Sequence, residues 1–412
     1  MIRLGMAVIV GSSNSLSQCY HARMRALYTL TLLLLTPILL VRSARKYRGL
    51  HWGVRQRLGF NRPRIDRPIW IHAASVGEVR AIAPIANDLI KQGPVLITTT
   101  TPTGRDQVVQ LCPDTTHAFL PYDLPWAMGA WMRALKPRCL LLVETELWPN
   151  LIHAAKVHEI PAVLVNGRLS KRSARGYARM GSLARNMMAS LDGCLVQSAD
   201  HATAFTRLGA HPLVIGNIKF DTQLPPSTLP SGRWIVAAST HPGEEAACLK
   251  AFAKISQTET NLKLLIVPRH PERFDDVVSE AEKHGEVGRA SRNQWAPAIV
   301  VGDAMGQLSG WLNGAEVAFI GGTLNRRGSQ SPIEAALGGA VIVAGPSRYN
   351  FAEAYALLAS GSLVDVADEP ELAGALNEAL TKDGDKNAAL ISASRGATAR
   401  TLAYLTSEIL RS

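Results

Sequence analysis

Glu78 is the residue of this sequence that most strongly suggests catalysis. It lies in PIWIHAASVGEVR, residues 68–80, where a short apolar run gives way to small residues and then to this single carboxylate. A strand that ends in a small-residue turn before a helix places the turn at the carboxyl edge of a sheet, where ligands of open α/β sheets bind. Glu78 is therefore a candidate general base. The alternative is that it only caps the helix, because negative charge stabilises the first helical turn.

Two turns in the second half of the chain have residues suited to binding anions. Ser239 and Thr240 follow an apolar run and precede a helical segment, so their hydroxyls and the backbone N–H groups could bind a phosphate. Arg269 ends the next apolar run, where a guanidinium suits bidentate contact with phosphate or carboxylate. The alternatives are a plain helix cap for the hydroxyls and a solvated surface charge for the arginine.

A third turn is richer in such residues. Gly321 and Gly322 follow the run VAFI and allow close approach of a ligand to the backbone. Ser331 and Glu334 have capping-box spacing at the start of the next helix, so Glu334 either reaches back to the cap or holds ribose hydroxyls. Asn350 could line the same cleft. No GxGxxG or Walker A pattern occurs, which disfavours ordinary dinucleotide and P-loop chemistry.

Alternating strands and helices must position these residues. Apolar runs at 69–74, 94–100, 139–143, 161–165 and 193–197 alternate with helix-length segments, and the pattern resumes with runs at 234–238, 263–267, 298–301, 316–320 and 340–344. This alternation predicts an α/β fold with two Rossmann-like domains, each a parallel sheet covered by helices on both faces. Residues 223–232 contain four prolines and predict a linker. The predicted domains are therefore 49–222 and 233–412.

The N-terminal part of the chain predicts a membrane anchor at residues 24–48. Residues 26–41 carry no charge, and Arg42, Arg45, Lys46 and Arg48 follow them. The apolar run is short for a full span, so the helix either crosses the membrane once or lies at its interface. The basic residues after it favour a cytoplasmic location for the rest of the protein. A buried core helix is the alternative. Residues 1–23 have no clear pattern and stay unassigned, because Met24 would make a natural start.

Length and charge narrow the class of protein. The chain has 412 residues and a formal net charge of +11, which predicts two domains and acidic partners such as phosphates, carboxylates or an anionic membrane. The basic residues are spread along the chain and no RNA-binding motif or zinc-finger spacing occurs, so we do not expect nucleic acid as a partner. The five cysteines lack metal-ligand or redox spacing, which predicts reduced, mostly buried thiols and no metal site.

Several of these segments resemble the Kdo transferases of lipopolysaccharide biosynthesis, which transfer 3-deoxy-D-manno-oct-2-ulosonic acid (Kdo). The matching segments occur in the family's order and span nearly the whole chain from about residue 24. They are WIHAASVGE (70–78), TTTPTGRD (99–106), LPYDLP (120–125), ETELWPN (144–150), VNGRLSKRS (165–173), GNIKFD (216–221), STHPGEE (239–245), PRHPERF (268–274), IGGTL (320–324) and GPSRYNFAEA (345–354).

The resemblance implies a glycosyltransferase of the GT-B type that inverts the anomeric centre without a metal or other cofactor. Its donor would be CMP-Kdo. Its acceptor would be the lipid A disaccharide precursor, lipid IVA, at the cytoplasmic face of the inner membrane. Glu78 matches the family's base, Arg269 an arginine on the CMP side, and Glu334 the glutamate that holds the ribose. A helix N-terminus lowers the pKa of a carboxylate, whereas a base works best near the operating pH, so burial must offset this effect at Glu78.

Acceptor binding is expected from two segments. The ETELWPN match implies Glu144, Glu146 and Asn150 as acceptor-binding residues. Arg168 and Lys171 belong to a basic group at 168–175, which we interpret as a loop that could meet the phosphates of a lipid disaccharide. A solvated charged loop is the alternative.

One segment departs from the family pattern of Gly-Gly-His-Asn, two residues and Glu-Pro. Here Ser329 replaces the second glycine, Gln330 the histidine and Ser331 the asparagine. Ser331 still suits a helix cap, and Arg326 and Arg327 could supply replacement charge. The change leaves two alternatives open: an inverting transferase that uses another nucleotide sugar, and a membrane-associated protein that binds nucleotide without catalysis.

Overall fold

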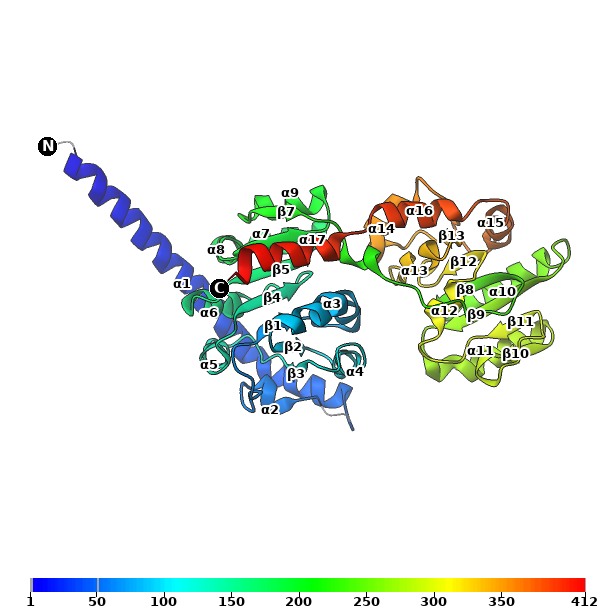
Figure 1. Ribbon diagram of the computed structural model, residues 1–412, viewed down its shortest axis with the longest axis horizontal. Helices are drawn as coiled ribbons and strands as arrows, with labels where there is room; N and C mark the ends of the chain where they lie inside the picture. The colour runs from blue at the N-terminus through cyan, green and yellow to red at the C-terminus, as the bar shows by residue number, and fades with distance from the viewer. Residues whose placement is uncertain (1–2, 50–51, 412) are drawn as a thin grey trace. The chain divides into compact units, whose positions relative to one another are not determined.

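The computed structural model describes residues 3–49 and 52–411, with side chains from residue 23 onward. The chain forms two compact units (Figure 1). Unit 1 comprises Met1–Ile218 and Gly396–Ser412, and unit 2 comprises Lys219–Arg395. Each unit is built on a parallel seven-stranded sheet, so the predicted pair of Rossmann-like α/β domains is confirmed.

The sheet of unit 1 has the strand order β3-β2-β1-β4-β5-β6-β7. Its strands are β1 (Ile69–His72), β2 (Val95–Thr99), β3 (Thr116–Phe119), β4 (Cys139–Val143), β5 (Ala162–Gly167), β6 (Gly193–Val196) and β7 (Pro212–Val214). The described helices are α1 (Arg3–Lys46), α2 (Val54–Arg57), α3 (Val76–Leu89), α4 (Pro102–Leu111), α5 (Pro125–Leu135), α6 (Pro149–Val157), α7 (Lys171–Arg179), α8 (Ser182–Ala189), α9 (Ala199–Arg207) and α17 (Ala397–Tyr404), with the short turns η1 (Ile90–Gln92) and η7 (Leu405–Ile409).

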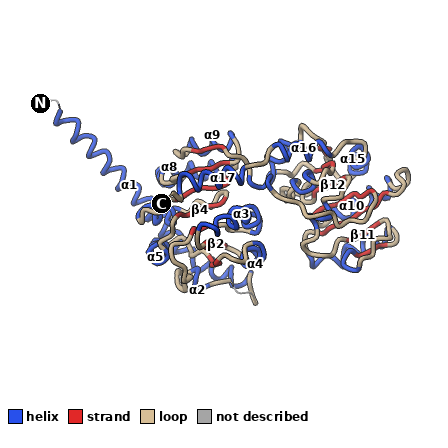
Figure 2. Tube along the Cα trace, in the orientation of Figure 1, coloured by secondary structure: helices blue, strands red, loops and turns tan. Residues whose placement is uncertain are grey.

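Helices cover both faces of this sheet, as Figure 2 shows for its blue helices and red strands. On one face α5, α6, α8 and α9 pack around Trp70 and Trp131, whose ring centroids lie 5.5 Å apart. On the other face α3, α4, α17 and η7 pack around Ile71, Ile97 and Leu141. Because both faces are buried, the central strands are continuous apolar runs, which is why the sequence identified them.

Unit 2 repeats this arrangement with the strand order β10-β11-β9-β8-β12-β13-β14. Its strands are β8 (Arg233–Thr240), β9 (Leu262–Pro268), β10 (Val287–Arg289), β11 (Ile299–Val301), β12 (Val317–Ile320), β13 (Val341–Ala344) and β14 (Leu363–Asp365). Its described helices are α10 (Glu244–Ile255), α11 (Phe274–Ala281), α12 (Leu308–Leu312), α13 (Ile333–Leu337), α14 (Ala352–Leu358), α15 (Leu372–Ala379) and α16 (Asp385–Ala393). Short turns are η2 (Ile218–Asp221), η3 (Pro271–Arg273), η4 (Glu282–His284), η5 (Ala290–Arg292) and η6 (Tyr349–Phe351).

Within α1, the stretch Arg23–Lys46 is the one described helix that is long and apolar enough to cross a membrane. One side of it packs on unit 1, in part against α8. Its less exposed positions recur every three or four residues, at Arg25, Tyr28, Leu32, Thr36, Leu40 and Ser43. The opposite side exposes Leu27, Leu30, Leu34, Ile38 and Val41. This part of α1 is therefore an apolar helix that contacts unit 1 along one side and leaves most of its apolar surface uncovered.

The structure differs from the sequence-based prediction at the end of the second domain, at residues 171–179 and at the predicted linker. The second domain was expected to run to residue 412, but the segment from Gly396 onward belongs to unit 1, where Ala397, Leu405 and Leu410 join the core. Residues 171–179 form helix α7, whereas the sequence predicted a loop. Residues 223–232 contain no helix or strand, but they belong to unit 2, which begins at Lys219, so the predicted linker position is wrong.

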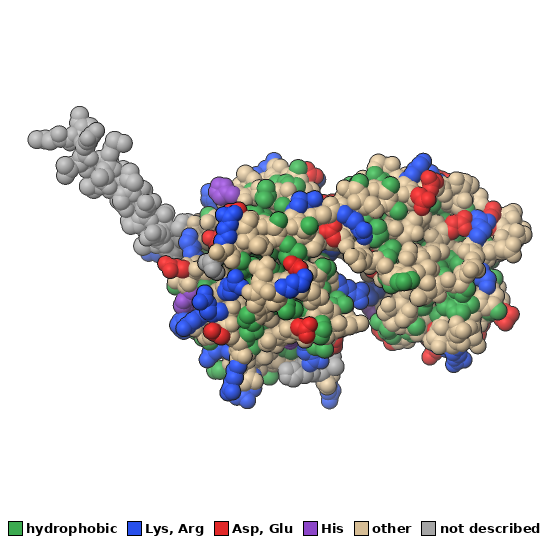
Figure 3. All heavy atoms as spheres, viewed as in Figure 1, with side chains coloured by type: hydrophobic (Ala, Val, Ile, Leu, Met, Phe, Trp, Pro, Cys, Tyr) green, Lys and Arg blue, Asp and Glu red, His purple; other side chains and the backbone are tan. Residues whose placement is uncertain are grey.

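The four cysteines with described side chains, Cys112, Cys139, Cys194 and Cys248, are all buried and reduced, as expected. Cys19 lies outside the described side chains. Lysine and arginine side chains are dispersed over both units on the face drawn in Figure 3, and they do not gather into one stripe there.

Candidate active site

The predicted residues of unit 1 meet at the carboxyl edge of its sheet. Strands β1, β4 and β5 are neighbours in the sheet, and all run in the same direction. Glu78 follows β1, Glu144 and Glu146 follow β4, and Arg168 follows β5. Since parallel strands end at a common edge, the topology brings together side chains that are far apart in the sequence.

Glu78 is held at the start of α3 by two hydrogen bonds. Its Oε2 accepts the backbone N–H of Ala74 at 2.6 Å, and its Oε1 accepts the hydroxyl of Ser75 at 2.9 Å. Ser75 is the N-cap residue and Glu78 the third helical residue, but the Ser75 hydroxyl caps no backbone N–H, and Glu78 accepts the N–H of the residue before the N-cap. A capping box is therefore not formed. The contacts of Glu78 instead fix its carboxylate in one orientation.

Burial raises the pKa of Glu78 to about 7, and the negative charges of Glu146 and Glu144 contribute to the rise. The hydrogen bonds from Ser75 and Ala74 lower this pKa, but they do not outweigh burial. A carboxyl group whose pKa lies near 7 can accept a proton efficiently at neutral pH. The conflict between the helix N-terminus and a base function is therefore resolved by burial.

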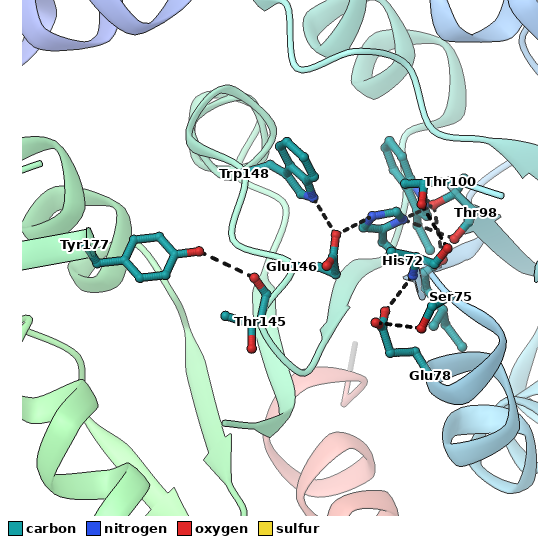
Figure 4. A network of polar contacts seen from close by, with 12 residues as sticks. His72, Ser75, Glu78, Thr98, Thr100, Thr145, Glu146, Trp148 and Tyr177 are labelled. Atoms are coloured by element: carbon teal, nitrogen blue, oxygen red, sulfur yellow. Dashed lines mark hydrogen bonds and ion pairs between the residues drawn. The ribbon is translucent and has the colours of Figure 1, made fainter. Parts of the chain in front are cut away.

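His72, the last residue of β1, is fully buried and supports Glu146 from behind. Its Nε2 lies 3.3 Å from Oε2 of Glu146, and its Nδ1 lies 3.1 Å from the carbonyl oxygen of Thr98. The indole N–H of Trp148 donates to the same Glu146 oxygen at 2.9 Å. Figure 4 shows this network beside Glu78 and Ser75. The sequence interpretation missed His72, although a polar residue at the end of an apolar run is a detectable signal.

Glu146 keeps its negative charge in this environment. Burial acts to raise the pKa of Glu146, but its contacts with His72 and Trp148 outweigh burial and hold the pKa below its ordinary value. Glu78 and Glu146 therefore differ in protonation although they lie at the same edge. Pairs of carboxyl groups whose surroundings drive their pKa values apart are typical of acid–base sites.

Glu144 and Arg168 form an ion pair between neighbouring loops. Nε of Arg168 lies 2.8 Å from Oε2 of Glu144, and the Glu144 side chain is buried while that of Arg168 is 41% exposed. Glu144 has a φ of 59°, a left-handed conformation that is unusual for a residue other than glycine. Lys171 is exposed at the start of α7. The basic group thus lies partly in a turn and partly on a helix.

Asn150 is directed into the protein interior. Its side-chain amide donates to the carbonyl oxygen of Asp123 at 2.6 Å and to the hydroxyl of Thr29 at 3.1 Å. Asp123 is buried, and its carboxylate accepts the backbone N–H groups of Asn150 and Leu151 at the start of α6. These contacts give Asn150 a role in packing. Asp123 lies in the matching segment LPYDLP, but its role could not be predicted, because its partners come from distant segments.

In unit 2, Ser239 and Thr240 end β8, and Gly321 follows the neighbouring strand β12. Ser239 has a φ of 54° and lies where the pairing of β8 with β9 shifts register. A Cβ at Gly321 would lie 2.3 Å from the Ser239 carbonyl oxygen, so only glycine fits there. The absent side chain of Gly321 therefore permits the contact between two turns. Close approach of a ligand to this backbone stays a prediction.

Glu244 organises these turns from the start of α10. Its buried carboxylate accepts the backbone N–H groups of His241 at 3.0 Å, Gly322 at 2.8 Å and Leu324 at 3.1 Å. Burial raises the pKa of Glu244, and these three hydrogen bonds oppose that rise. We had not singled out Glu244. Its signal in the sequence is a carboxylate three residues after the turn, as for Glu78.

The expected capping box at Ser331 and Glu334 is wrong. The short helix α13 begins at Ile333 with Pro332 as its N-cap residue, and Oε1 of Glu334 accepts the hydroxyl of Ser309 at 2.7 Å. The hydroxyl of Ser331 accepts the Ile333 N–H at 3.4 Å. Glu334 is thus turned toward α12, because the first helical turn lies one residue later than the pattern suggested.

Asn350 and Ser329 shape the turn that departs from the family pattern. The Asn350 amide donates to the carbonyl oxygens of Arg327 at 3.2 Å and Ser329 at 3.4 Å, so it ties η6 to this turn. Ser329 has a φ of 77°, and its hydroxyl lies 2.6 Å from the Tyr355 hydroxyl. The family's glycine suits this conformation, and serine adopts it here with a buried hydrogen bond.

Arg269 is exposed just after β9, and its backbone N–H donates to the carbonyl oxygen of Thr240 at 3.0 Å. The side chains of Thr240 and His241, from the adjacent turn, are buried. Arg269 therefore stands at the same edge as Ser239, Thr240, Gly321 and Gly322. Among residues 23–49 and 52–411, no group of three or more His, Cys, Asp or Glu side chains has the arrangement of a metal site.

Comparison with known proteins identifies the family. A family model described as 3-deoxy-D-manno-octulosonic-acid transferase (kdotransferase) matches residues 52–222. The 3-deoxy-D-manno-octulosonic acid transferase of Bordetella pertussis is 33% identical over 363 residues, which cover 80% of this chain and 85% of that protein. The Haemophilus influenzae protein of the same name is 33% identical over 367 residues, covering 81% of this chain and 85% of that protein.

A solved structure with a similar fold is the glycotransferase of kitacinnamycin, which matches 84% of this chain and 99% of its own with a TM-score of 0.54 and 15% identity. At that identity the likeness concerns the fold alone, which is of the GT-B type. The sequence similarity to both bacterial enzymes extends over most of their length, and this chain therefore belongs to the 3-deoxy-D-manno-octulosonic acid transferases, a family of glycosyltransferases.

Proposed function

We propose that the protein transfers Kdo from CMP-Kdo to the lipid A disaccharide precursor, lipid IVA, with inversion at the anomeric carbon. The observation that carries the proposal is the carboxylate of Glu78, which is fixed by Ala74 and Ser75 at the sheet edge and whose pKa is raised to about 7 by burial. Family membership supports the choice of sugar. Glu78 then acts as the general base toward the acceptor hydroxyl.

The proposed step balances as a single displacement. The acceptor oxygen forms a bond to the anomeric carbon C2 of Kdo, while the bond from C2 to the phosphate oxygen breaks. CMP departs with that electron pair, and the acceptor proton passes to Glu78. Positive charge must stabilise the departing phosphate, and we assign this role to Arg269. We propose that the step needs no bound metal, and full activity in the presence of EDTA would support this.

Donor binding is proposed for the carboxyl edge of the sheet in unit 2. The turns that carry Ser239, Thr240 and the two glycines are fixed there by Glu244, which supports a preformed site. Ser331, Glu334 and Asn350 belong to the adjacent segments, for which we propose contacts with the nucleotide. The hydrogen bond from Ser309 orients Glu334, a carboxylate that suits ribose hydroxyls.

Acceptor binding is proposed for the edge that carries Glu78. Arg168 and Lys171 suit the phosphates of a lipid disaccharide, because a guanidinium binds phosphate in a bidentate manner. Glu144 fixes the guanidinium of Arg168. Glu146 lies beside the base, where it could accept a sugar hydroxyl. We propose that Asn150 supports this edge indirectly, through Asp123 and the start of α6.

The membrane partner is proposed to be the cytoplasmic leaflet of the inner membrane. In the stretch Arg23–Lys46 of α1, Leu27, Leu30 and Leu34 are exposed, while the opposite side contacts unit 1, in part through α8. A helix in that arrangement can bury its exposed side at a membrane interface without leaving the domain. Arg42, Arg45 and Lys46 suit anionic lipid headgroups beside it. Of the two predicted modes of attachment, we therefore propose the interfacial one.

Purified protein, CMP-Kdo and lipid IVA test the proposed function together. We expect CMP release that depends on lipid IVA, and a product whose mass has increased by one or more Kdo units. A Glu78→Gln variant is the matched control, because it keeps the shape and one hydrogen-bond acceptor. No CMP release by the wild-type protein above background would refute the assignment.

A second candidate function follows from the turn at 328–331, where Ser329, Gln330 and Ser331 replace the family's residues. The protein would then be an inverting transferase for a different nucleotide sugar. A panel of CMP-, UDP- and GDP-sugars decides between the two, since preference for a UDP- or GDP-sugar would select this alternative. Nucleotide binding by calorimetry without turnover of any donor would instead select a non-catalytic protein.

A further inference from the structure

His241 is a buried histidine whose ring has no hydrogen-bond partner within the described part of the chain. Its side chain is 4% exposed, and both Nδ1 and Nε2 are buried and unpaired. The hydroxyl of the preceding residue, Thr240, is buried and unpaired as well. Buried polar groups are normally satisfied, so two adjacent unsatisfied side chains call for an explanation. A ligand that supplies the missing partners provides one.

The ring of His241 lies where three turns of unit 2 meet. A Cβ placed on Gly322 would lie 3.5 Å from the ring, and the ring centroid of His270 lies 5.7 Å away. Burial lowers the pKa of His241, and the nearby charges of Arg327 and Arg269 add to this effect. A neutral ring has one N–H donor and one acceptor nitrogen. The surrounding side chains supply positive charge for an anion.

The carboxylates near His241 are already compensated. Glu244 accepts three backbone N–H groups, including that of His241 itself. Glu245 is paired with Arg273, whose Nη1 lies 2.6 Å from Oε1 of Glu245. Neither carboxylate contacts the ring nitrogens through a hydrogen bond. The arginines at 269 and 327 therefore dominate the local field, which favours an anionic ligand.

We propose that the ring N–H of His241 and the hydroxyl of Thr240 bind the carboxylate of the donor's acidic sugar. The inference rests on the proposed function, because it concerns the donor of that reaction. A carboxylate accepts a donor on each oxygen and matches two adjacent donors. A neutral sugar has no such group, so its binding would leave the two buried side chains unpaired. Sites built in this way reject ligands that lack the matching group.

The proposed site therefore binds one of the two anionic groups of the donor, the sugar carboxylate, and not the phosphate. The sugar carboxylate contacts His241 and Thr240, whereas the phosphate of CMP lies elsewhere at the same sheet edge. CMP alone carries the phosphate and lacks the acid. Comparing CMP with CMP-Kdo consequently distinguishes contacts with the sugar acid from contacts with the nucleotide.

Three variants of the full-length protein test this assignment: His241→Phe, which keeps the ring volume, Thr240→Val, which is nearly isosteric, and His241→Gln, which keeps a donor. With CMP-Kdo as donor we expect kcat/KM to fall about tenfold or more for His241→Phe, with smaller losses for the other two. The inhibition constant of CMP should stay within about twofold of wild type. The control is His284→Phe, the same exchange at an exposed position in η4.

A donor analogue whose C1 acid is a carboxamide sharpens the test. The loss of kcat/KM caused by His241→Phe should be smaller with this analogue than with CMP-Kdo, because the carboxamide already weakens the contact with His241 that the variant removes. Unchanged kcat/KM in variants that remain folded would overturn the proposal. Equal weakening of CMP would also overturn it, and would place the phosphate at His241. Since wild-type CMP release is measured in the same assay, a failure of the proposed function itself would be recognised separately.

Discussion

The carboxylate of Asp123 joins helix α1 to the sheet edge of unit 1 that carries the candidate active site. Its Oδ2 accepts the hydroxyl of Tyr28 at 3.0 Å and the backbone N–H of Asn150 at 2.9 Å. Asn150 is the second residue of α6, and α6 follows the loop that carries Glu144 and Glu146. One buried carboxylate thus supports both α1 and the helix behind the acidic loop.

Replacing Asp123 by alanine should destabilise the protein strongly. The change leaves three donors without an acceptor: the buried backbone N–H groups of Asn150 and Leu151 and the partly buried Tyr28 hydroxyl. We expect the free energy of unfolding to fall by about 3 kcal/mol, against about 1 kcal/mol for Tyr28→Phe, which removes one donor. Denaturant titration measures both. Asp106→Ala is the control, because that carboxylate is exposed and should contribute little. Equal effects at both aspartates would contradict the assigned role.

Glu78→Gln should abolish transfer while the protein stays folded. Glutamine can still accept the Ala74 N–H, but it cannot take the acceptor proton. We expect kcat to fall by about 10²-fold to 10⁴-fold, the usual contribution of a general base. CMP binding, measured by calorimetry, should be unchanged. If Glu78 were only a helix cap, the loss would appear in thermal stability and kcat would be nearly normal.

The pH dependence of transfer should report the ionisation of Glu78. Its pKa is raised to about 7, and the base acts when it is deprotonated, so kcat/KM should rise with pH through neutrality and level off above it. Removing a nearby negative charge lowers the pKa of a carboxyl group, because ionisation then meets less repulsion. The rising limb of Glu146→Gln should therefore lie at lower pH than that of wild type. A limb that does not move would exclude electrostatic coupling between these two residues.

Charges introduced on the exposed side of α1 should weaken membrane binding. Leu30 and Leu34 are 55% and 70% exposed. The double exchange to glutamate should lower partitioning into vesicles of phosphatidylethanolamine and phosphatidylglycerol by about tenfold or more. The control variant replaces Val109 and Val157 by glutamate, which adds the same charge. Both residues are similarly exposed, on α4 and α6. Sedimentation with vesicles measures the bound fraction, and equal losses in both double variants would refute a specific membrane face.

The orientation of α1 can be measured with nitroxide labels placed singly at Leu30 and Val41. Both positions are exposed on the same side of the helix. A helix in the plane of the interface should place the two labels at the same depth. A helix that spans the bilayer would separate them by about 16 Å along the membrane normal. Depth measurement by electron paramagnetic resonance therefore distinguishes the two modes of attachment.

Ser329→Gly should reveal two opposing effects. Glycine relieves the left-handed conformation, worth about 1 kcal/mol, but it removes the hydroxyl that contacts Tyr355. We expect little net change in wild type. In a Tyr355→Phe background the contact with Tyr355 is already lost and only the donation from Ser329 to the Gln330 carbonyl oxygen remains, so the same exchange should be more favourable to stability there than in wild type. Thermal unfolding is measured for wild type, the two single variants and the double variant. An equal effect of Ser329→Gly in both backgrounds would contradict a stabilising contact between Ser329 and Tyr355.

The central strands were predictable from the sequence and the edge strands were not. Strands β1, β2 and β4 are buried on both faces and therefore appear as continuous apolar runs. The strands that the sequence did not indicate are β3, β7, β10 and β14, which are the outermost strands of the two sheets. Edge strands have one neighbour and partial exposure, so short mixed sequences suffice for them.

The candidate site residues also divide into those that the sequence could predict and those that it could not. Glu78 could be located because a strand, a small-residue turn and a helix start are all local patterns. The role of Asp123 was not predictable, because it acts through partners from remote segments that a linear pattern does not reveal. His72 ends an apolar run and could have been identified, but its contact with Glu146 could not. The cap at Ser331 was misplaced because Pro332 became the N-cap residue instead of the first helical one. Local geometry was thus accessible to sequence reasoning, whereas long-range polar contacts were not.

The participation of residues 396–411 in unit 1 has a consequence for how the protein is made. Ala397, Leu405 and Leu410 complete a core that begins with β1, although the ribosome adds them after all of unit 2. Domains usually fold as soon as they emerge during synthesis. Unit 2 can do so here, whereas unit 1 must wait for the last helix, with part of its apolar surface uncovered in the meantime. A nascent chain arrested before residue 396 would accordingly be a client for chaperones through its first half rather than its second.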